Sequence, residues 1–147
     1  MNKYFFLQLK ELGIDYEHPW NDQSVQCVTV PGAAALWFDA LDQFGSKKLS
    51  HERIFRDPID LAENGFPVSP VVSSNWRMRS VQIQNANENS RQTFFVGEGK
   101  DRSPVAGEIF TNKDLANTLR KVAAEGKKGF YEGEIAERIV EQVQSLG

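Results

Sequence analysis

The side chains best suited to catalysis or metal binding are few and lie far apart. The two histidines, His18 and His51, have no motif around them, and the single cysteine, Cys27, has no second cysteine or histidine nearby. A zinc site needs three or four nitrogen or sulfur ligands, usually at close and regular spacing. The sequence therefore predicts no metal site. We expect His18 in a loop, His51 solvated in the first turn of a helix, and Cys27 buried as a small apolar residue.

Other chemical signatures are incomplete. Residues 97–100, Gly-Glu-Gly-Lys, resemble part of a phosphate-binding loop, but Asp101 stands where that loop needs a hydroxyl. There is no Gly-x-Ser-x-Gly turn for a serine nucleophile. The pair Lys127-Lys128 is typical of a solvated face. From its own residues the chain thus predicts no catalytic, substrate-binding or metal-binding site and no cofactor.

Size and charge restrict the partners. The 147 residues, 40% of them hydrophobic, are enough for one globular domain. With 20 acidic and 17 basic side chains the net charge is −3, which disfavours nucleic acid as a partner. No apolar run approaches the roughly 20 residues that span a bilayer, and the apolar stretch at residues 4–7 is too short for a secretion signal. We expect a soluble chain.

The elements that must position any site are mostly helices. An apolar stripe predicts a helix over 33–44, and Ser50 caps a second helix that should kink or restart at Pro58, with Asp57 capping the restart. A third helix is expected from Ser69 to Trp76. Cleaner patterns predict helices over 113–125, capped by Thr111, and over 133–146. The remaining expectations are a short helix at 4–12, strands at 25–30 and 93–96, an exposed loop at 84–92 and a tight connection at 129–133.

Two ordered blocks of residues combine helix-entry and helix-exit glycines with apolar residues placed directly after a turn, as suits a scaffold. The first block comprises residues 30–35, 44–45 and 61–69, and the second 107–110, 114–116, 118–119, 126, 129–131, 133–136 and 139–140. In their order and spacing these blocks resemble the gamma-glutamyltransferase (glutathione hydrolase) family. The resemblance runs from about residue 28 to the C-terminus and indicates an internal segment of the family's large subunit.

The resemblance implies an N-terminal-nucleophile hydrolase. In that family a precursor cleaves itself, and the new N-terminal threonine of the small subunit attacks the gamma-glutamyl carbonyl, with its own amine as base. An upstream arginine holds the substrate's alpha-carboxylate. Residues 1–27 contain no arginine, and none of the threonines stands in the family's Thr-Thr-His context; they are Thr29, Thr93, Thr111 and Thr118.

These observations give a composite expectation. Residues 1–27 form a lead outside the family pattern and of uncertain structure, and residues 28–147 form an incomplete large-subunit domain. The fold is expected to be mostly α with a few short strands, the helical segment of the αββα sandwich. The expected partners are the rest of the large subunit, the small subunit and, through the missing regions, gamma-glutamyl substrates such as glutathione.

Two other functions remain open at this point. The chain is alternatively a catalytically inactive truncated homologue that acts as a binding or regulatory module. A related amide acylase with the same self-cleaving fold is the third possibility. Behaviour in solution distinguishes these functions. A fragment of a larger fold exposes apolar patches, whereas an independent module unfolds cooperatively.

Overall fold

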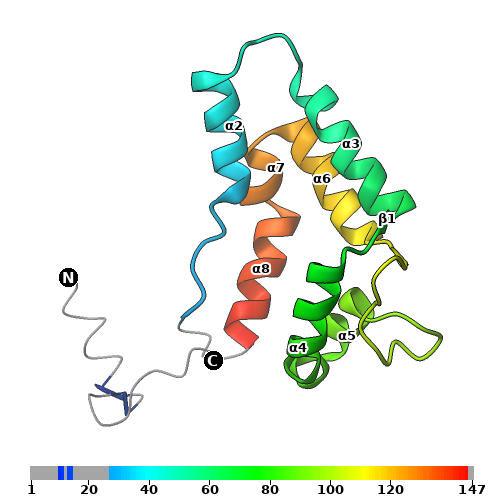
Figure 1. Ribbon diagram of the computed structural model, residues 1–147. Helices are drawn as coiled ribbons and strands as arrows, with labels where there is room; N and C mark the ends of the chain where they lie inside the picture. The colour runs from blue at the N-terminus through cyan, green and yellow to red at the C-terminus, as the bar shows by residue number, and fades with distance from the viewer. Residues whose placement is uncertain (1–9, 12, 15–26, 146–147) are drawn as a thin grey trace.

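The computed structural model describes residues 10–11, 13–14 and 27–145, and it consists mainly of helices (Figure 1). The predicted helix at 4–12 and the loop containing His18 lie largely outside the described residues. One pair of two-residue strands completes the fold. In chain order the elements are α2 (Ala33–Phe44), α3 (His51–Asn64), β1 (Phe66–Pro67), α4 (Pro70–Ala86), α5 (Glu88–Phe94), β2 (Ile109–Phe110), α6 (Lys113–Glu125), α7 (Lys128–Tyr131) and α8 (Glu134–Ser145).

The core lies where α3 packs along α6. Phe55 of α3 and Val122 of α6 are 5% and 1% exposed. Phe38 of α2 stacks on Phe55 with 5.7 Å between ring centroids, and Leu119 closes the cluster. Aromatic rings in contact at this distance bury a large apolar area and add about 0.5–1.5 kcal/mol beyond it. This small cluster therefore joins the consecutive helices α2 and α3 to α6, which is distant from both in sequence.

A short strand pair attaches the next layer. β1 and β2 are antiparallel, with Phe66 opposite Phe110. Gly65, which ends α3, has a φ of 100°, and a Cβ there would lie 2.5 Å from the Cγ2 of Ile109. Only glycine fits this conformation and this close approach. Gly65 thus ends α3 and lets β2 pass against it.

The helices α4 and α5 pack on this strand pair through aromatic side chains. The Trp76 ring lies edge-on to Phe110 at 4.8 Å and to Phe94 at 6.0 Å between centroids. Phe95, which follows α5, is 1% exposed. Contacts of the half-buried Trp76 with the buried Phe110 and the exposed Phe94 thus hold α4, a helix that has no fully buried residue of its own.

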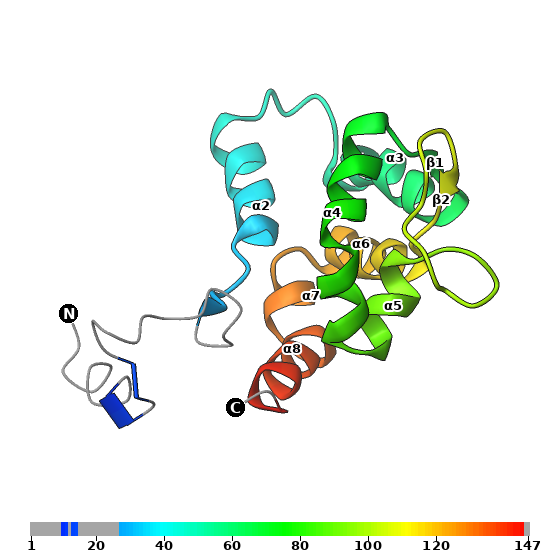
Figure 2. The ribbon, with the colours of Figure 1, turned by 60° about the horizontal axis from the view of Figure 1, so that its bottom comes forward.

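The long connection from α5 to β2 is fastened to α4 (Figure 2). The Ser73 hydroxyl donates to the Pro104 carbonyl at 3.1 Å, and the Ser103 hydroxyl donates to the Trp76 carbonyl at 3.3 Å. Within the loop, both terminal nitrogens of the Arg102 guanidinium donate hydrogen bonds to the Glu108 carboxylate, each at 2.9 Å. Such a bidentate pair fixes orientation as well as distance. The loop is therefore ordered by side-chain bonds.

Four of the expected helices are confirmed. The helix over 33–44 and the helix over 113–125 have the predicted bounds, and α8 agrees with 133–146 to one residue at each end. α3 begins after Ser50, whose Oγ accepts from the Arg53 amide at 3.2 Å, and ends at Gly65. Helix caps and apolar periodicity were sufficient to predict the positions of these four helices from the sequence.

Several local predictions are wrong. The stretch 84–92 is not a loop, because α4 continues to Ala86 and α5 begins after Asn87, whose Oδ1 accepts from the Ser90 amide at 2.8 Å. Residues 93–94 belong to α5, so no strand forms at 93–96, although Val96 makes an isolated bridge. The tight connection at 129–133 contains most of α7. The local sequence of α4 and α5 is polar and predicted a loop, but tertiary packing of Trp76 stabilises helices there.

The helix restart expected at Pro58 does not occur. α3 is continuous from His51 to Asn64, and the Pro58 side chain within it is exposed. Asp57 accepts two bonds from Arg53, at 3.1 and 3.2 Å, and does not cap a new helix. The cap of α6 is Asn112, not Thr111, because the Asn112 Oδ1 accepts from the Leu115 amide at 2.9 Å.

The core cluster gives a first prediction. Phe55→Ala should lower the free energy of unfolding by about 3–5 kcal/mol, because it removes a buried ring and leaves a cavity. Phe44→Ala removes a ring that is 84% exposed and should change it by less than about 0.5 kcal/mol. Urea unfolding followed by circular dichroism measures both. Equal losses from the two variants would contradict the assigned core.

The Arg102–Glu108 pair gives a second prediction. The Arg102 hydrogen bonds, and then the Val105 amide, lower the pKa of Glu108 from its ordinary 4.5 to about 2. Since the folded pKa is the lower one, the stabilisation is complete above pH 4.5 and is lost as the pH falls towards 2. Glu108→Gln should therefore have a lower Tm than the original chain at pH 7, and the difference should shrink between pH 5 and 2. A difference independent of pH in Tm scans would contradict this ion pair.

Candidate functional site

The residues singled out for chemistry do not converge in the structure. His51 opens α3, as expected, with its ring edge-on to Phe38 at 4.8 Å and its Nε2 3.4 Å from the Asp42 carboxylate. Cys27 is exposed, so its predicted burial is wrong. Residues 28–30, which follow it, are exposed as well and do not form the strand predicted over 25–30, so this segment supplies no core for the thiol. Among the described residues, no three histidine, cysteine or acidic side chains are grouped to hold a metal.

The four threonines lie in four separate surroundings. Thr29 belongs to an extended segment, Thr93 to α5 and Thr118 to the middle of α6, while Thr111 precedes α6. Each has a peptide nitrogen here, and it would gain the free amine of an N-terminal nucleophile only if the chain were cleaved directly before it. None of the four stands in the Thr-Thr-His context that the resemblance implies for such a cleavage.

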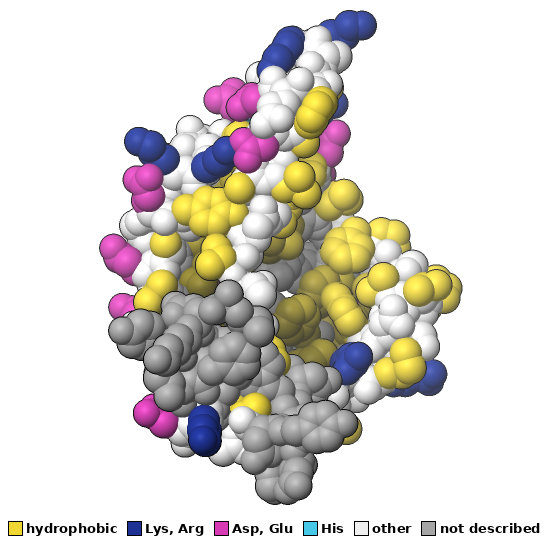
Figure 3. All heavy atoms as spheres, turned by 90° about the vertical axis from the view of Figure 1, so that its left-hand side faces the viewer, with side chains coloured by type: hydrophobic (Ala, Val, Ile, Leu, Met, Phe, Trp, Pro, Cys, Tyr) yellow, Lys and Arg dark blue, Asp and Glu magenta, His cyan; other side chains and the backbone are white. Residues whose placement is uncertain are grey.

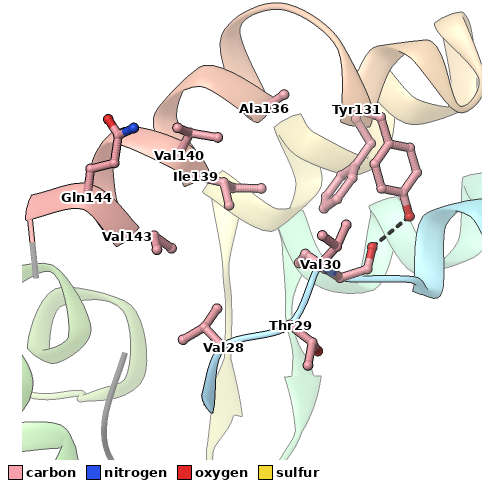
Figure 4. A pocket seen from close by; sticks show the side chains of 11 residues that line it. Val28, Thr29, Val30, Tyr131, Ala136, Ile139, Val140, Val143 and Gln144 are labelled. Atoms are coloured by element: carbon pink, nitrogen blue, oxygen red, sulfur yellow. Dashed lines mark hydrogen bonds between the residues drawn. The ribbon is translucent and has the colours of Figure 1, made fainter. Parts of the chain in front are cut away.

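An apolar hollow of the described surface lies between residues 28–31 and the helices α7 and α8. Its volume is about 460 Å³. We call it the α8 groove, and Figure 4 shows its labelled side chains around the open space. Valine, isoleucine and phenylalanine dominate it, so it suits an apolar segment better than a charged small molecule. Its lining consists of Val28, Thr29, Val30, Pro31, Phe130, Tyr131, Ala136, Ile139, Val140, Val143 and Gln144.

Tyr131 fixes the edge of this groove to the start of α2. Its hydroxyl donates to the Pro31 carbonyl at 2.6 Å and accepts from the Ala35 amide at 3.1 Å (Figure 4). The first amides of a helix have no partner within it, and the N-cap of α2, Gly32, supplies no side-chain bond. Tyr131 therefore takes the capping role from 96 residues away. Sequence reasoning missed this cap, because Tyr131 is remote in sequence from both partners and no local pattern indicates it.

A second apolar surface follows α2. Leu36, Trp37 and Phe44 are 64%, 41% and 84% exposed, although the periodicity groups them in one stripe. Figure 3 shows hydrophobic side chains gathered around a hollow on the side of the molecule that carries α2. Monomers rarely leave such a continuous apolar area in water. The exposed side chains of α2 therefore suit contact with another apolar surface. Among the described residues, they do not form a set of reactive groups.

The Tyr131 contact gives a third prediction. Tyr131→Phe should lower the free energy of unfolding by about 1–2 kcal/mol, because it leaves the Ala35 amide and the Pro31 carbonyl without their partner. The Ala35 amide should also exchange with solvent faster. Ser80→Ala removes a hydroxyl whose 2.8 Å bond to the Arg77 carbonyl is local and exposed, and it should change stability by less than about 0.5 kcal/mol. Urea titration and amide exchange test both variants; unchanged exchange at Ala35 would exclude the cap.

Known proteins match both the sequence and the fold. The chain is 36% identical over 121 residues to the glutathione hydrolase-like YwrD proenzyme of Bacillus subtilis; the match covers 82% of this chain and 22% of that protein. The gamma-glutamyltranspeptidase of Helicobacter pylori superposes with a TM-score of 0.76 at 30% identity, over 90% of this chain and 38% of the other. A cephalosporin acylase from Bacillus halodurans superposes with a TM-score of 0.74 at 30% identity, over 90% and 24% respectively.

The match extends beyond the two blocks of residues. The sequence model described as gamma-glutamyltranspeptidase matches residues 12–147. The mostly helical fold with two short strands, expected from the sequence, is confirmed by the structure and by its neighbours. The chain spans about a fifth of the length of its curated relative. From its sequence and its fold, the chain belongs to the gamma-glutamyltranspeptidase family of N-terminal-nucleophile hydrolases.

Proposed function

We propose that this chain is a segment of an enzyme that hydrolyses or transfers the gamma-glutamyl group of glutathione and related amides. The observation that carries the proposal is the family match over residues 12–147, since it takes in nearly all of the described fold. The relative from Bacillus subtilis is named as glutathione hydrolase-like, which favours this substrate class. The nucleophilic threonine belongs, in this proposal, to a part of the polypeptide outside residues 1–147.

The proposed role of the segment is to form the helical flank of the catalytic sandwich. The α3–α6 core makes a rigid unit, while the α2 stripe and the α8 groove leave apolar surface for the rest of the enzyme. The partners are then the remainder of the large subunit and the small subunit. No side chain of the segment is proposed to touch the reacting bond, and the chain alone is expected to be inactive.

A second function is favoured by one structural neighbour. The cephalosporin acylase covers as much of this chain as the transpeptidase does, with nearly the same TM-score. An amide acylase with another acyl group is therefore the alternative proposal. In both cases the chemistry is nucleophilic attack on an amide carbonyl, and the substrates differ in the acyl group.

Isolation of the natural polypeptide gives a fourth prediction. Antibodies against residues 107–147 should capture, from the cells that make it, a species larger than the 16.6 kDa of this chain. Mass spectrometry and N-terminal sequencing should then find a second, smaller chain that begins with threonine. The captured protein should release gamma-glutamate from a chromogenic gamma-glutamyl anilide, whereas the purified 147-residue chain should not.

Each other outcome selects a different function. Cleavage of a cephalosporin-type amide without cleavage of the gamma-glutamyl anilide would establish the acylase. A natural species of 16.6 kDa that melts cooperatively and binds no hydrophobic dye would contradict both enzymes and establish an independent binding module.

A further inference from the structure

The junction between α3 and β1 (Figure 1) contains the only asparagine of the chain that is followed by glycine, Asn64 before Gly65. The backbone nitrogen of the following residue can attack an asparagine side chain. The five-membered imide that results forms fastest before glycine, which has no side chain to obstruct the attack. Asn64 is exposed at the end of α3, so water and hydroxide reach it. The junction therefore holds the atoms needed for a self-modification.

Two hydrogen bonds direct the reacting atoms away from each other. The Gly65 amide, whose nitrogen is the nucleophile of this reaction, donates to the Leu61 carbonyl at 3.0 Å. The Asn64 Nδ2, which is the leaving nitrogen, donates to the Asp60 Oδ1 at 2.7 Å. Both bonds run back into the last turn of α3. The modification thus requires this turn to open.

The outer side of this turn is the part that is free to open. Asp60, Leu61 and Asn64 are all exposed, and helix ends open with a smaller free energy than cores do. On the inner side, Ala62 is 5% exposed, and its carbonyl accepts from the Asn112 amide at 2.7 Å. Opening is therefore local, and it leaves the packing of α3 on α6 in place.

We infer that Asn64 is a site of spontaneous deamidation whose rate is set by opening of the last turn of α3. When the turn opens, the Gly65 nitrogen loses its proton to solvent base and bonds to the Asn64 Cγ. The bond from Cγ to Nδ2 breaks, and ammonia leaves. Water then opens the imide and gives aspartate or isoaspartate at position 64. The reaction consumes only water and releases only ammonia.

The isoaspartate product does not fit the original junction. Gly65 has a φ of 100°, and a Cβ there would lie 2.5 Å from the Ile109 Cγ2 and 3.2 Å from the Phe110 carbonyl oxygen. Isoaspartate adds a carbon to the main chain directly before this crowded glycine. In either product a carboxylate also replaces the amide that donated to Asp60, and like charges four positions apart on a helix repel. Modified chains should therefore hold α3 and the strand pair less firmly.

Ageing of the 147-residue chain in mildly alkaline buffer tests the site. Peptide mass spectrometry follows conversion at Asn64, with Asn75, which precedes the bulky Trp76, as internal control. Conversion should be at least about tenfold slower in the folded chain than in urea, because two hydrogen bonds must break before the attack. Asn64→Gln should abolish it, since the corresponding six-membered ring forms far more slowly. If the isolated chain shows no helical circular dichroism, the comparison is made on the natural polypeptide captured through residues 107–147.

Two substitutions at Asp60 provide a matched pair. Asp60→Ala removes the acceptor of the Asn64 side chain and should speed conversion in the folded chain at least about threefold. Asp60→Asn removes the same charge but keeps an acceptor oxygen, so it should retain the slow rate. In urea, where no helix positions these side chains, the two variants should convert equally fast.

Every outcome decides the inference. Equal rates at Asn64 in the folded chain and in urea, or no conversion in urea, would overturn it. Equal rates for Asp60→Ala and Asp60→Asn in the folded chain would overturn the role given to the side-chain hydrogen bond. Aged chains that contain isoaspartate and keep the original Tm would contradict the misfit at Gly65. None of these results alters the gamma-glutamyl proposal, which depends on the activity of the natural polypeptide.

Discussion

Packing of α3 on α6 is the interaction on which the described fold depends. Phe55 and Val122 meet between these helices, and Phe38 brings α2 to the same cluster. Burial of apolar surface is the main source of stability, and this cluster is small for a chain of 147 residues. Every other element is attached to this pair by a few specific contacts: Gly65 and β2 at one end of α3, and α7 at the end of α6.

The same constraint explains why so much apolar surface remains exposed. A helix must cover its apolar stripe with another element, yet the stripe of α2 and the rim of the α8 groove are uncovered in this segment. Membership of a family whose proteins are several times longer gives this a physical reason. The α3–α6 face is buried within the chain itself, and in the proposed function the exposed faces contact the rest of the enzyme.

Sequence reasoning identified the elements whose signals are local. Apolar periodicity and end caps placed α2, α3, α6 and α8, since Ser50, Gly65 and Gly126 act within one turn of their helix. It missed α5 and most of α4 because their stability comes from Trp76 contacts with residues far along the chain. The same limit hid Tyr131, whose partners are 96 and 100 positions away.

The Tyr131 contact also orders events during synthesis. A ribosome adds Ala35 roughly 5–20 s before it adds Tyr131, if it translates about 5–20 residues per second, because the two are separated by 96 positions. Throughout that interval the first turn of α2 has only water for its free amides, and the stretch before it has no anchor. The nascent chain thus passes through a period in which α2 exposes its apolar side chains and has not yet received the Tyr131 hydrogen bonds. Chaperone binding would protect α2 during this period.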